Sequence, residues 1–160
     1  MADATHVDTI RTALLRRYLT MLSPAVVLFA VWAACRQAGL VQSLGLGNID
    51  LVGKIVFISA IVLAVALPMF YRIRFVKSVE GSRNVSEEAF VPFQLTLMSL
   101  ALLAPYVAAA GYIAAVSTFH FSGAFLAGLY GAYYYFPSDR RVAQEMRLFR
   151  VSRDNGDNRA

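Results

Sequence analysis

No Asp, Glu, Lys or Arg occurs in the 50 residues from Ala89 to Ser138, which read AFVPFQLTLMSLALLAPYVAAAGYIAAVSTFHFSGAFLAGLYGAYYYFPS. At about 1.5 Å per residue, one helix of this length would measure about 75 Å. The hydrocarbon core of a bilayer is only roughly 30 Å thick, so the chain must turn back within this stretch. We predict the turn at the polar segment Ser117–Gly123. The result is a hairpin of two spans, over residues 89–115 and 119–137.

Two further apolar runs precede this hairpin and predict spans over residues 18–36 and 52–72. Proline should kink the second span at Pro68 and the third at Pro105. Over the whole chain 58% of the residues are hydrophobic and 16% are charged, against about a quarter charged in soluble domains. The sequence therefore predicts an all-α integral membrane protein with four transmembrane helices.

The basic residues are distributed unevenly, which predicts the orientation. Of the 15 Lys and Arg residues, three precede the first span, four lie between the second and third spans, and six follow the last span. With both ends in the cytoplasm, 13 basic residues lie inside and 2 outside, as the positive-inside rule requires. We expect a multi-pass protein of a bacterial-type cytoplasmic (inner) membrane. Cleavage before a lipidated Cys35 is an alternative, but it would leave three spans and lose this asymmetry.

Both ends of the chain have amphipathic patterns. Residues 1–17 and the tail, residues 138–160, carry apolar side chains at helical intervals among polar and basic ones. We expect a short helix lying at the membrane surface in each, the first running into the first span. The apolar positions are Val7, Ile10, Leu14 and Tyr18 in the first segment and Val142, Met146 and Phe149 in the tail.

Residues that could carry catalysis are scarce. The interior of the four spans contains no Asp, Glu, Lys or Arg, and such residues occur only at the span edges, which weighs against a proton-coupled exporter. A single cysteine, Cys35, excludes an internal disulfide and a CxxC site, and His6 and His120 are far apart in sequence. We therefore predict no catalytic residue, metal or cofactor. We expect no nucleic-acid partner, because the loop bias explains the net charge of +5.

Small residues recur every three or four positions in the last two spans and predict close helix packing. One arm of the hairpin should pack on the other. A second row on the same helix could also receive another membrane protein or a second copy of the chain. The predicted packing interface comprises Gly123, Ala127 and Gly131, the neighbouring row Ala124, Gly128 and Ala132, and on the third span Ala104, Ala108 and Gly111.

Two polar sets have open interpretations. Thr96, Ser99 and Tyr106 lie loosely along one side of the third span, where they either line a substrate path or hydrogen-bond to neighbouring helices. The tail arginines either contact anionic lipid headgroups or an acidic partner, or only determine the topology. These arginines are Arg140, Arg141, Arg147 and Arg150.

In length and number of spans the chain resembles the small membrane subunits of tripartite secondary transporters, a resemblance of overall layout. Our leading hypothesis is a non-catalytic small inner-membrane protein that acts as a subunit or scaffold of a larger complex. The first alternative is a small transporter or channel component with the polar path along span three. The second is an enzyme acting at the cytoplasmic interface through Glu87 and Glu88, although paired acids at a helix start more often stabilise the helix.

Overall fold

The computed structural model describes residues 2–41, 48–80 and 84–152, and within these ranges it describes side chains from residue 8 to residue 151. The predicted all-helical class is confirmed, and within these described ranges one pair of two-residue strands interrupts it. The elements are α1 (Ala2–Gln37), α2 (Ile49–Ile61), the π-helical turn η1 (Val62–Ala66), α3 (Leu67–Ser78), β1 (Val85–Ser86), α4 (Glu87–Ala101), α5 (Ala104–Ile113), α6 (Thr118–Tyr134), α7 (Asp139–Leu148) and β2 (Val151–Ser152).

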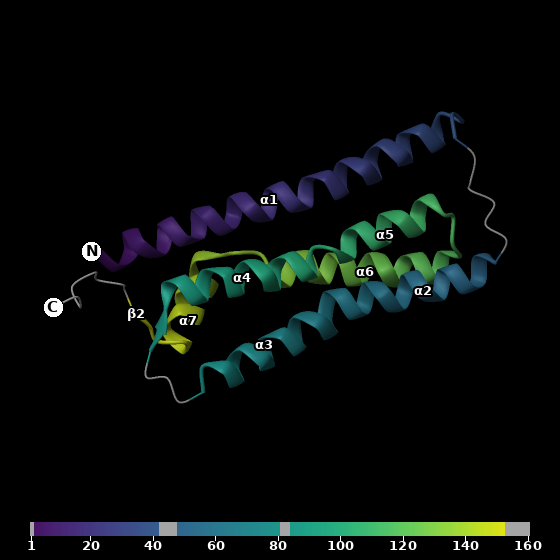
Figure 1. Ribbon diagram of the computed structural model, residues 1–160. Coiled ribbons are helices and arrows are strands. Elements are labelled where there is room, and N and C mark those ends of the chain that lie inside the picture. The colour runs from purple at the N-terminus through teal and green to yellow at the C-terminus, as the bar shows by residue number, and fades with distance from the viewer. Residues whose placement is uncertain (1, 42–47, 81–83, 153–160) are drawn as a thin grey trace.

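The long helices lie alongside one another in an elongated bundle (Figure 1). Helices α2, α5 and α6 pack most closely, and α1 lies against α4 and α5. The start of α1, the end of α3, the strands and α7 gather at one end, which we call the terminal base; the turn between α5 and α6 and the start of α2 lie at the other, the turn end (Figure 1). Within the described residues, three helical segments are long and apolar enough to cross a membrane: Asp8–Gln37, Ile49–Ser78 and Glu87–Ile113. The protein is therefore a multi-pass membrane protein.

The N-terminal amphipathic segment, which we expected to run into the first span, forms one helix with it. Helix α1 is continuous from Ala2 to Gln37, and Pro24 does not interrupt it. The apolar side chains of Ile10 and Leu14 lie buried against the protein rather than facing lipid. Of the predicted apolar positions, Val7 lies outside the described side chains.

Prolines account for the two irregular places within the long helices. Pro68 has no N–H to donate to the preceding turn, and directly before it η1 widens, with the N–H of Leu67 donating to the carbonyl of Val62. Pro105 likewise stands at the start of α5, and the helix is interrupted at Leu102 and Leu103, between α4 and α5. The predicted kinks therefore take the form of a π turn and a short break.

The hairpin turn lies earlier than predicted. The residues from Thr118 to Gly123 belong to α6, and the turn runs from Ala114 to Ser117 instead. Ala115 makes the reversal in a left-handed conformation, with a φ of 52°. The prediction placed the turn at polar residues and Gly123. In the structure Gly123 packs on Phe57 of α2 instead, and Ala115 adopts the positive φ.

The tail helix α7 also departs from prediction, because its apolar face is covered by the chain itself. Val142 is buried against Ile10 and Leu14 of α1. Beyond the end of the helix, Phe149 packs edge to face on Phe75 and Phe93. The parallel pairing of β1 with β2 aligns Val85 with Val151 and joins the tail to the segment before α4. The terminal base is thus a packed unit, and the apolar face of α7 is not available to lipid.

Candidate functional site

The small residues of α6 lie where neighbouring helices approach closely. A Cβ added at Gly128 would lie 3.2 Å from the backbone of Pro105, and one added at Gly131 would lie 3.0 Å from the carbonyl oxygen of Ala101. On the adjacent side of α6, a Cβ at Gly123 would lie 2.3 Å from the ring of Phe57 in α2. Members of both rows therefore face helices of this chain: Gly123 lies towards α2, Gly128 towards α5 and Gly131 towards the end of α4.

The remaining small positions show the same close packing. Gly111 of α5 lies against Val56 of α2, with 2.7 Å from an added Cβ to the valine methyl group. Of the alanines in the predicted packing interface, Ala104, Ala108 and Ala124 are buried and Ala132 is half-buried. Ala127 packs on the apolar cluster that contains Ala108 and Ala124.

The three polar residues of the predicted path differ in their contacts. The hydroxyl of Tyr106 donates to the carbonyl oxygen of Met21 at 2.5 Å, and that of Ser99 donates to the sulfur of the same methionine at 3.2 Å. The hydroxyl of Thr96 donates to Pro92 within its own helix at 2.9 Å. Two of the three residues thus connect the α4–α5 segment to α1.

Helix α1 is joined to α6 by a hydrogen bond that the sequence did not indicate. The hydroxyl of Tyr18 donates to the carbonyl oxygen of Ala132 at 2.8 Å, and its ring packs edge to face on Phe136. A tyrosine near the start of a span ordinarily indicates the membrane interface. No local pattern marks its partner, because Ala132 is 114 residues further along the chain.

The terminal base contains a buried acid that sequence analysis did not single out. Glu145 of α7 is only 6% exposed. Its carboxylate accepts a hydrogen bond from the amide of Gln94 in α4, and it lies 3.5 Å from both Arg72 of α3 and Arg141 of its own helix. One carboxylate therefore links α3, α4 and α7. The spacing of Arg141 and Glu145 could have predicted only the pair within α7.

The tail arginines divide into an internal and an external set. Arg141 lies over the rings of Tyr134 and Tyr135, at 4.5 and 5.1 Å from their centroids, in addition to its ion pair. Arg140 and Arg147 are exposed. Arg150 adopts a φ of 48° and lines a groove beside α3. The external set leaves positive charge on the outer surface of the base.

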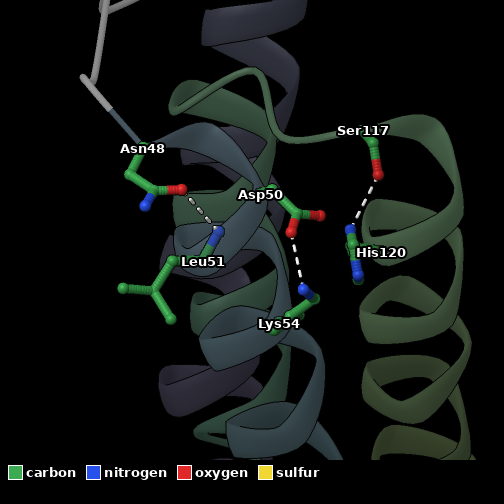
Figure 2. Close-up of polar contacts among 6 residues, drawn as sticks. All are labelled: Asn48, Asp50, Leu51, Lys54, Ser117 and His120. Atoms are coloured by element: carbon green, nitrogen blue, oxygen red, sulfur yellow. Dashed lines mark hydrogen bonds and ion pairs between the residues drawn. The ribbon is translucent and has the colours of Figure 1, made fainter.

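A second polar group lies at the turn end, where α2 and α6 begin (Figure 2). The side chain of Asn48 accepts the Leu51 N–H at 3.2 Å, and Lys54 donates to Asp50 at 2.6 Å. Across from them, Ser117 and His120 are hydrogen-bonded at 2.7 Å (Figure 2).

These contacts at the turn end stabilise helix starts. The ring of His120 also packs on Gly53, where an added Cβ would lie 2.7 Å from Nδ1. In the part of the chain that the structure describes, no three His, Cys, Asp or Glu residues lie together so that they could hold a metal ion.

The fold and these sites define a multi-pass, all-helical membrane protein whose polar contacts mainly join its own helices. Comparison with models of known families, with curated proteins and with solved structures finds no match to this chain.

Proposed function

We propose that this protein is a non-catalytic subunit or scaffold of a larger complex in a bacterial-type cytoplasmic membrane, with four spans and both ends inside. The observation that carries the proposal is the terminal base. Its members are held by a buried carboxylate and an apolar core, and it leaves exposed arginines on its outer surface. A rigid basic surface of this kind suits the binding of an acidic partner protein.

The direction of the chain supports an even number of spans. Helix α1 starts at the terminal base and α7 lies there too (Figure 1). A chain that leaves and returns to one end crosses the bilayer an even number of times. Helix α6 has 17 residues, or about 26 Å, which is close to the roughly 30 Å of the hydrocarbon core. With α6 as the fourth crossing, the count is even.

The distribution of charge supports an inside location for the base. Most basic residues of the described chain lie in the elements that form the base, whereas Arg36 lies at the end of α1 and Lys54 near the start of α2, towards the turn end. An orientation with the base in the cytoplasm agrees with the positive-inside rule.

Single-cysteine labelling tests this orientation, because Cys35 is the only native cysteine. In a Cys35→Ser background, we place one cysteine at Leu40, which is 75% exposed, and in a separate variant at the exposed Arg147. An impermeant maleimide should label the Leu40→Cys variant in intact cells and the Arg147→Cys variant only after permeabilisation. The reverse pattern, or labelling of both in intact cells, would contradict the proposed topology.

Native mass spectrometry after gentle extraction tests the subunit role. We expect the chain in an assembly of fixed composition, with another protein or with further copies of itself. Reversing the charge of Arg140 and Arg147 to glutamate should reduce that assembly at least several-fold, because both side chains are exposed on the base. Lysine at the same two positions is the matched control. A monomer that carries no other protein would refute the subunit role.

One observation favours the alternative role in transport. Thr96 and Ser99 line an open groove between α1 and α4. Tyr106, the third member of the predicted path, does not line that groove, and its hydroxyl donates to the backbone carbonyl oxygen of Met21. The transport role would be favoured by substrate flux into liposomes that is lost on altering Ser99 but unchanged on altering the exposed arginines of the terminal base.

A further inference from the structure

The groove between α1 and α4 differs chemically between its two ends. It has a volume of about 890 Å³ and is open along one side. Near the terminal base its wall carries Arg16 and Arg17, whereas its far end is formed by Leu100 and Leu103. The complete lining is Ala13, Leu14, Arg16, Arg17, Thr20, Met21, Val91, Leu95, Thr96, Ser99, Leu100 and Leu103.

The two arginines provide a positive end without a counter-charge. They are the only charged residues among those lining the groove, and no carboxylate joins them there. The preceding basic residue, Arg11, is paired with Asp139 at 2.8 Å. Across the described residues, neither Arg16 nor Arg17 has an ion pair, and both are exposed. An anion at this end would therefore be bound without displacing an existing partner.

The length of the groove matches one leaflet. Helices α1 and α4 run in the same direction from the terminal base (Figure 1), and the contact of Ser99 with Met21 places these two residues at one level. Arg16 lies five residues before that level and Leu103 four residues beyond it, so about 13 Å separates them along the helix axes. Half of a roughly 30 Å hydrocarbon core is about 15 Å.

We propose that this groove binds one acidic phospholipid of the leaflet that the terminal base faces. The phosphate lies between the guanidinium groups of Arg16 and Arg17, which can each donate two parallel hydrogen bonds to phosphate oxygens. One acyl chain follows the groove past Leu95 and Leu100 to Leu103. The proposal rests on the membrane-spanning arrangement of α1 and α4 but not on the subunit role.

Titration of lipid into the purified, delipidated full-length chain, followed by native mass spectrometry, tests the site. The probes are phosphatidylglycerol and phosphatidylcholine with identical acyl chains. We expect a first phosphatidylglycerol to bind roughly tenfold or more tightly than phosphatidylcholine, since two basic groups favour the anionic headgroup. Changing Arg16 and Arg17 to glutamine should abolish that preference.

Two matched variants separate a lipid site from a general attraction of charge. Arg140→Gln with Arg147→Gln removes the same charge outside the groove and should keep the preference. Leu103→Trp fills the far end without changing charge, at a residue that is 41% exposed, and should weaken both lipids alike.

Three results would overturn the proposal. The first is an unchanged preference after the change at Arg16 and Arg17. The second is an equal loss of preference in the tail variant, which would indicate diffuse electrostatic attraction. The third is full competition by free glycerol phosphate, which would indicate an anion site without an acyl-chain site. Success or failure of the lipid proposal is distinguishable from failure of the subunit role, because the subunit role is decided by the composition of the extracted assembly and not by lipid binding.

Discussion

Replacing Glu145 with alanine should release α7 from the terminal base. The carboxylate of Glu145 is the one group that contacts Gln94 of α4, Arg72 of α3 and Arg141 of α7 together. Alanine removes all three contacts and leaves the amide of Gln94 without its buried acceptor. We therefore expect the docked position of α7 to lose stability while the rest of the bundle stays folded.

The magnitude follows from the exposure of each partner. A hydrogen bond to a charged group contributes roughly 1.5 to 3 kcal/mol, which applies to the buried bond with Gln94. The side chains of Arg72 and Arg141 are 35% and 25% exposed, so solvent screens each pair and each contributes at most about 1 kcal/mol. Because the contacts share one carboxylate, we expect a total of about 2 to 4 kcal/mol. Glutamine at this position keeps a hydrogen bond to Gln94 and should cost less.

Cysteine accessibility measures this undocking directly. In a Cys35→Ser background, Val142→Cys places a thiol at a position of α7 where the native side chain is 5% exposed and packs on Ile10 and Leu14. Maleimide can react only when α7 opens, so the rate follows the open population. A loss of about 2 to 4 kcal/mol should raise the rate roughly 30- to 900-fold, at about 1.36 kcal/mol per factor of ten.

The matched control is Arg140→Ala, which alters an exposed residue of the same helix and should leave the rate unchanged. If Glu145→Ala reacts no faster than its Val142→Cys parent, the carboxylate does not hold α7. The apolar contacts with α1 and the aromatic cluster would then account for the docking alone.

Two further predictions concern the bundle. Tyr106→Phe removes the hydroxyl that donates to Met21, which should cost about 0.6 to 1.7 kcal/mol in a detergent unfolding titration; an unchanged midpoint would mean that this bond does not stabilise the bundle. Gly123→Ala places a methyl group 2.3 Å from the ring of Phe57. Overpacking of this kind costs about 1 to 3 kcal/mol, whereas alanine stabilises a helix by roughly 1 kcal/mol relative to glycine, so we expect the variant to be less stable than the parent. Adding Phe57→Leu should restore stability, and a Gly123→Ala variant as stable as the parent would contradict the close approach.

Several features of the fold were predictable because they depend on chain length and covalent chemistry. An uncharged stretch of 50 residues exceeds the thickness of any bilayer, so a helical hairpin was expected whatever its packing. Proline lacks an N–H to donate, and irregular helix occurs beside Pro68 and Pro105 as predicted, although α1 continues through Pro24. These inferences need no knowledge of neighbouring helices.

The position of the turn was predicted less well. The polar segment Ser117–Gly123 has the composition of a turn, but most of it forms the first turns of α6. Within this segment the side chain of Ser117 hydrogen-bonds that of His120, and Gly123 allows the close approach of Phe57. Glycine in a sequence marks either a turn or a close contact, and the tertiary structure decides between them.

By itself, the sequence determined that this chain is helical, that it belongs in a membrane, where its uncharged hairpin lies and which helix faces carry small or apolar residues. Periodicity identifies a face but not what covers it. Only the tertiary structure decided that the apolar face of α7 packs on α1 and that Glu145 is buried beside Gln94. Those contacts join residues far apart in the chain. The apolar burial and the hydrogen bonding that stabilise them therefore have no local signature in the sequence. The hairpin was thus fixed by the length of an uncharged stretch, and the terminal base by the packing of distant segments.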